Sequence, residues 1–84
     1  MNTQTIDLAR MRWRCRRGTR ELDALLTWYL DHRHRDADGG QQLGFERLLD
    51  AEDPDVWDWC MGRTPAPDPQ MREVIDAIRA HHLF

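Results

Sequence analysis

The residues of this sequence best suited to recognise another molecule lie at positions 16–23, which read Arg-Arg-Gly-Thr-Arg-Glu-Leu-Asp. Arginine and tryptophan are enriched at the centres of protein interfaces, and complementary charges fix the register of two partners. Glu21 and Trp28 stand seven residues apart, so a helix places both on the flank of its apolar side. One hypothesis is therefore an exposed recognition patch that includes Glu21 and Trp28.

A structural interpretation explains the same residues. Gly18 supplies the positive φ that ends one helix and begins the next. If Gly18 is the N-cap of the second helix, Glu21 occupies the third helical position, where its carboxylate reaches back to the cap N–H. Arg17 then pairs with Glu21 on the surface, and Trp28 packs against another helix. Composition and spacing alone favour this structural role for positions 16–23.

Other reactive residue types lack the spacing that catalysis or metal binding needs. Cys15 and Cys60 form no CxxC pair and are expected to be reduced thiols, and Cys15 is expected to lie in the core. His32 and His34 point to different faces of a helix, do not match a zinc spacing, and are expected to be solvated in the last helical turn. The sequence also contains no phosphate-binding glycine loop and no Ser/His/Asp arrangement. We therefore predict no catalytic residue, no metal site and no bound cofactor.

A basic cluster suggests a rival function. Six of the twelve arginines fall within eleven positions that contain no acidic residue, with Trp13 among them, a composition that suits phosphate contacts and base stacking. The six are Arg10, Arg12, Arg14, Arg16, Arg17 and Arg20. The formal net charge of −3 and an acidic block between Asp50 and Asp58, which would screen the arginines, argue against nucleic-acid binding. A small nucleic-acid-binding domain remains the alternative.

Glycine and proline divide the chain into short segments with helical periodicity. Apolar residues recur at helical spacing in two of them, Leu22, Leu25, Leu26 and Tyr29, and Met71, Val74, Ile75 and Ile78. These patterns predict helices over about 22–33 and 69–81, the latter capped by Asp68 and opened by Pro69. A third helix is expected from Asp53-Pro54 to Gly62; it is apolar on most sides and therefore expected to be central. A fourth is expected over about 41–51, although Gly44 weakens it.

The first segment is ambiguous, because residues 10–16 alternate as a half-buried strand does. Leu8, Met11 and Cys15 also fit one face of a helix, and the sequence offers no second strand to pair with. We choose the helix. The 84 residues then form a single domain, 1–84, that is all-α, a compact bundle of five short helices. With neither an apolar segment of bilayer length nor a signal-peptide pattern, the protein is expected to be cytoplasmic.

Two blocks of the sequence resemble one protein family. Arg17-Gly18-Thr19-Arg20-Glu21-Leu22-Asp23 matches the RGxxE motif, with its usual Leu-Asp continuation, of the FAD assembly factor family of succinate dehydrogenase. Residues 13–18 are similar to the approach to that motif in enterobacterial members. The stretches Phe45-Glu46-Arg47-Leu48-Leu49 and Asp53-Pro54-Asp55-Val56-Trp57-Asp58-Trp59 resemble the second conserved block of the family. The likeness covers about residues 8–80, and Cys60 departs from it, since a larger aliphatic residue is common there.

The resemblance implies a five-helix assembly chaperone that is not itself an enzyme. Family members bind the flavoprotein subunit of succinate dehydrogenase, and of fumarate reductase, and promote covalent attachment of FAD to a histidine of that subunit. Carried over by position, the partner-binding surface consists of Arg17, Gly18 and Glu21, with Arg16, Trp13 and Arg20 as neighbours. We expect the free protein to be a monomer that neither binds nucleic acid nor inserts into a membrane.

Overall fold

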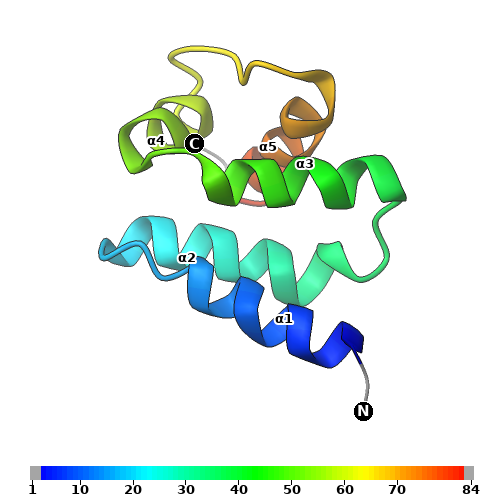
Figure 1. The fold of residues 1–84 in the computed structure, drawn as a ribbon. Coiled ribbons are helices and arrows are strands. Elements are labelled where there is room, and N and C mark those ends of the chain that lie inside the picture. The colour runs from blue at the N-terminus through cyan, green and yellow to red at the C-terminus, as the bar shows by residue number, and fades with distance from the viewer. Residues whose placement is uncertain (1–2, 83–84) are drawn as a thin grey trace.

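Five α-helices make up the computed structural model, which describes residues 3–82 and the side chains of residues 8–82 (Figure 1). They are α1 (Thr3–Arg14), α2 (Arg20–Tyr29), α3 (Gly39–Asp50), α4 (Asp53–Cys60) and α5 (Pro69–His82). No strand occurs between residues 3 and 82, so the predicted all-α class and the helical interpretation of residues 10–14 are confirmed. The Cα radius of gyration is 12.0 Å, as a compact chain of this length should have.

The apolar stripe of α2 is buried as predicted, but the helix does not continue regularly. After Tyr29 the chain forms a π-helical turn, η1 (Leu30–His34). A π-helical turn advances by five residues instead of four, so the position below Tyr29 on the core face is taken by His34 and not by Arg33. His34 is only 7% exposed, and the centroid of its ring lies 5.4 Å from the centroid of the Phe45 ring. The prediction that His34 is solvated was therefore wrong, whereas His32 is exposed.

The most extensive helix pairing joins α3 to α5. A Cβ on Gly44 would lie 2.6 Å from backbone atoms of Gln70, so the glycine that weakens α3 is what allows this close approach. Both helices begin at aspartate caps, where Asp38 accepts a hydrogen bond from the Gln41 N–H and Asp68 accepts one from the Met71 N–H, each at 2.8 Å. The predicted start of α5 is confirmed, and α3 begins two residues before its predicted start.

Helix α4 is peripheral, contrary to the prediction of a central helix. Only Val56 and Cys60 are buried in it, whereas Trp57 and Trp59 are half-buried. The helix has just eight residues and packs mainly against α5, so its large aromatic side chains cover the edge of the core instead of filling its centre. Gly62 follows this helix with a φ of 76°, which confirms the predicted glycine stop.

Among the helices of residues 3–82, none is both long and apolar enough to cross a membrane.

Candidate functional site

The turn between α1 and α2 contains three of the six predicted site residues, Arg16, Arg17 and Gly18, and the other three lie in the helices on either side of it. Gly18 has a φ of 90°, and a Cβ built on it would meet no atom within 4 Å. The backbone conformation therefore requires glycine here, although the space around it is open. This confirms the predicted positive φ and places Gly18 on an open surface.

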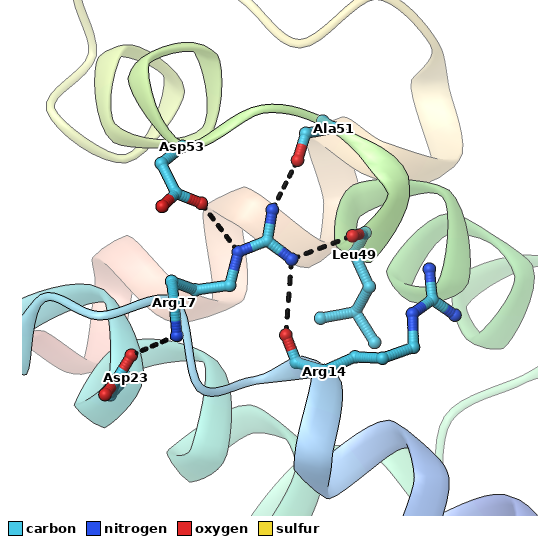
Figure 2. A network of polar contacts seen from close by, with 6 residues as sticks. All are labelled: Arg14, Arg17, Asp23, Leu49, Ala51 and Asp53. Carbon is cyan, nitrogen blue, oxygen red and sulfur yellow. Dashed lines mark hydrogen bonds and ion pairs between the residues drawn. The ribbon is translucent and has the colours of Figure 1, made fainter.

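Arg17 points inward from this turn and joins it to the turn between α3 and α4 (Figure 2). Its guanidinium group donates hydrogen bonds to the carbonyl oxygens of Leu49 at 2.8 Å, Arg14 at 3.2 Å and Ala51, and it forms an ion pair with Asp53 at 2.7 Å. The side chain is only 12% exposed. Leu49 and Ala51 lie at the C-terminal end of α3, where carbonyl groups lack helical partners and the helix dipole is negative. Arg17 is thus a brace that caps α3 and ties it to α1 and α4.

The Leu-Asp continuation also has a structural role. Leu22 is buried in the core, and the Asp23 carboxylate accepts a hydrogen bond from the backbone N–H of Arg17. The N-cap of this helix is Thr19 and not Gly18, so Glu21 occupies the second helical position. The predicted capping box from Gly18 to Glu21 and the pairing of Arg17 with Glu21 are therefore wrong. Asp53 is the partner of Arg17 because the inward-facing guanidinium group meets the start of α4.

Of the three fixed residues of the RGxxE motif, Arg17, Gly18 and Glu21, only Glu21 has no evident structural function. It is exposed, and within residues 8–82 it forms no hydrogen bond or ion pair. It borders a shallow, largely apolar cavity of about 270 Å³, lined by Thr19, Glu21, Leu22, Asp53, Pro54 and Trp57. The site therefore combines an apolar depression with two carboxylates at its edge, one unpaired and one held by Arg17.

The remaining predicted site residues lie on the surface beside this turn. Trp13 is 72% exposed, an unusual position for so large an apolar side chain. Arg16 and Arg20 are exposed, and neither forms an ion pair among the residues described. The structure thus separates the six predicted residues into an internal brace, Arg17, and five exposed groups.

The acidic block neutralises part of the basic cluster. Arg14 pairs with Asp50 and Arg17 with Asp53, which confirms the predicted screening, and Arg12 pairs with Asp31 of the π-helical turn. The hydrogen bond from Arg12 holds the pKa of the Asp31 carboxyl below its usual range. Three of the six clustered arginines are therefore engaged within the chain.

Trp28 does not belong to this surface. Its ring stacks on His81 of α5 at a centroid distance of 4.0 Å and is half-buried. Of the two interpretations of Trp28, packing against another helix is the correct one. Pro54 and Trp57, in contrast, line the cavity beside Glu21 and were not selected as site residues. The signal that could have identified them was their place in the second conserved block of the family that the chain resembles.

Comparison with known proteins assigns the chain to a family. Residues 9–82 match the family model described as the flavinator of succinate dehydrogenase. The chain belongs to this family.

Several relatives are named FAD assembly factor SdhE. The protein from Shewanella oneidensis is 37% identical over 76 residues, covering 90% of this chain and 93% of the relative. The one from Xylella fastidiosa strain 9a5c is 43% identical over 74 residues, covering 88% of this chain and 76% of the relative. The one from Colwellia psychrerythraea is 34% identical over 77 residues, covering 92% and 85%. The flavinator family therefore accounts for nearly the whole chain.

The cysteines of this flavinator family member are core residues. Cys15 and Cys60 are free and buried, and burial raises the pKa of each thiol to about 11. Nearby arginines, Arg12 and Arg17 beside Cys15 and Arg79 beside Cys60, lower these values only partly. Over residues 8–82, no group of three or more His, Cys, Asp or Glu side chains is placed to hold a metal ion.

Proposed function

We propose that this protein binds the flavoprotein subunit of succinate dehydrogenase through the surface formed by Trp13, Arg16, Gly18, Arg20 and Glu21, and so promotes covalent attachment of FAD to a histidine of that subunit. The flavoprotein subunit of fumarate reductase is a second candidate partner. The proposal places the protein in the cytoplasm, as a monomer when free, without enzymatic activity of its own.

The observation that carries the proposal is that the residues of the RGxxE motif and its Leu-Asp continuation have different roles. Arg17 and Asp23 are satisfied inside the fold, and Gly18 sets the backbone of the turn. The Glu21 side chain forms no hydrogen bond or ion pair within residues 8–82, yet it lies exposed beside an apolar cavity. A charged side chain without an internal function, next to an apolar depression and an exposed tryptophan, is what a partner-binding surface provides.

The surface favours a specific chemistry in the partner. The cavity beside Glu21 accepts an apolar side chain, and the carboxylates of Glu21 and Asp53 at its edge attract a neighbouring Lys or Arg. Exposed Arg16 and Arg20 lie in the same stretch and suit an acidic group further along. We therefore expect the flavoprotein to present an apolar residue between a basic and an acidic group.

In this proposal the flavoprotein supplies both the histidine and the FAD that become joined. The present chain supplies a rigid surface that holds the flavoprotein in one arrangement, which accelerates the reaction through orientation and electrostatics. Arg17 contributes indirectly, because its four contacts fix the turn that presents Gly18 and Glu21. The nucleic-acid alternative is weakened, because Arg12, Arg14 and Arg17 are already paired.

The test compares Glu21→Gln with Glu73→Gln, an exposed acidic residue on α5 away from the turn. Both variants should unfold at the same denaturant concentration as the parent, because neither carboxylate is buried. Only Glu21→Gln should lose capture of the flavoprotein in a pull-down and lower its covalent flavin, measured by in-gel fluorescence after denaturation. Equal capture by both variants would remove Glu21 from the interface. Full covalent flavin in a strain that lacks the gene would contradict the function itself.

A further inference from the structure

A second cavity lies between α5 and the end of α4 with the segment that follows it. It has a volume of about 300 Å³ and shares no lining residue with the cavity beside Glu21. Its charged and polar lining includes Trp59, Arg63, Thr64, Arg72, Asp76 and Arg79. Three arginines and a single acidic residue, Asp76, therefore line one small space.

Arg79 is the least satisfied arginine of this cavity. Its guanidinium group lies directly under Gly62, since a Cβ on Gly62 would be 2.6 Å from one of its terminal nitrogens. The Nε atom is buried and has no hydrogen-bond partner among residues 8–82, and no ion pair of Arg79 is formed there either. A buried donor without an acceptor is unfavourable, because it has lost its water without gaining a partner. Arg79 thus provides a cationic wall that lacks its anion.

The other two arginines keep donors available. Arg72 uses its Nε atom to donate to the Ala66 carbonyl at 2.7 Å, which fixes the guanidinium plane at the cavity wall. Arg63 forms one partly exposed contact to Asp58 at 3.2 Å, through a single terminal nitrogen. Since a guanidinium group has five N–H donors, most donors of these two residues are not used by the chain.

We propose that this cavity binds a phosphate group. Guanidinium groups donate paired hydrogen bonds to the oxygens of phosphate. Three positive charges also suit a doubly charged phosphate better than a singly charged carboxylate. Asp76 and Asp58 reduce the positive charge but leave the three arginines in excess over the lining carboxylate. The ring of Trp59 lines the same space, so it offers a surface for the organic part of a phosphate ester. The site is independent of the proposed flavoprotein interface.

Heteronuclear NMR of the full chain, titrated with inorganic phosphate or with ADP, tests the proposal. Sodium chloride and sodium acetate at the same ionic strength are the controls. Phosphate should cause saturable shifts of the Arg79 side chain and of the backbone amides of Gly62, Arg63, Thr64 and Ala66. Tighter binding of ADP than of phosphate would identify a phosphate ester as the ligand, and equal binding would identify free phosphate.

Variants locate the site. Arg79→Gln should weaken binding about tenfold, the effect of losing one strong charge-assisted hydrogen bond. Arg63→Gln should also weaken binding. Because the Arg63 side chain is largely exposed, this variant should fold, and it covers the case in which Arg79→Gln does not. Arg35→Gln, an exposed arginine outside the cavity, should bind as the parent does. Equal shifts with chloride or acetate, shifts centred on residues 10–20, or unchanged binding by Arg63→Gln would overturn the proposal.

Discussion

Replacing Arg17 by alanine should unfold much of the protein, because this side chain holds two turns together. The substitution removes hydrogen bonds to three carbonyl oxygens, each contributing about 1 kcal/mol, and an ion pair to the partly exposed Asp53, which contributes at most about 1 kcal/mol. The expected loss in the free energy of unfolding is therefore about 3 to 4 kcal/mol, close to the whole stability of about 3 to 5 kcal/mol expected for so small a core.

Urea denaturation followed by far-ultraviolet circular dichroism measures this loss. The matched control is Arg20→Ala, since Arg20 is exposed in the same motif and unpaired among residues 8–82; it should change the free energy of unfolding by less than about 0.5 kcal/mol. The two variants thus separate an internal brace from a surface arginine. A loss below about 1 kcal/mol for Arg17→Ala, together with loss of flavoprotein capture, would refute the reasoning and make Arg17 an interface residue.

Three further predictions concern the turn, the buried histidine and the thiols. Gly18→Ala and Gly18→Arg should each lose about 1 to 2 kcal/mol of stability in urea denaturation through the positive φ, but only the bulky arginine should also abolish capture of the flavoprotein. Burial lowers the pKa of His34, with Glu46 opposing this only partly, so the unfolded chain binds a proton first as the pH falls. Stability to urea should therefore decrease as the pH falls below about 6.5, and His34→Leu should show a smaller decrease; an identical pH dependence would exclude His34 as its source. Native Cys15 and Cys60, with a pKa of about 11, should react with a thiol reagent at pH 8 at least about tenfold more slowly than in urea; equal rates would show that the core is open.

The sequence predicted features that depend on neighbouring residues. The apolar stripes of α2 and α5, the cap at Asp68 and the positive φ of Gly18 involve residues within one or two helical turns of each other. Periodicity and capping preferences report such local relations directly. The family resemblance rested on short stretches of consecutive residues for the same reason, and the family comparison confirmed it.

Two incorrect predictions concern the burial of His34 and the position of α4. A π-helical turn moved His34 onto the core face, which the regular period of 3.6 residues does not foresee. Helix α4 has an apolar composition but too little length to occupy the centre, so its tryptophans remain half-buried. Both outcomes depend on how the elements pack against one another.

The sequence alone determined which segments are helical, which faces are apolar and which residues belong to the RGxxE motif. Only the tertiary structure decided what each motif residue does. Arg17 contacts groups 32 to 36 positions away, at Leu49, Ala51 and Asp53. The residue that was predicted to bind the partner is therefore a brace within the fold. Glu21, three residues after Gly18, was left exposed by the same arrangement. An arginine side chain donates hydrogen bonds to the acceptors that folding brings within about 3 Å of its nitrogen atoms. The sequence does not specify which acceptors these are, because they can be far away along the chain.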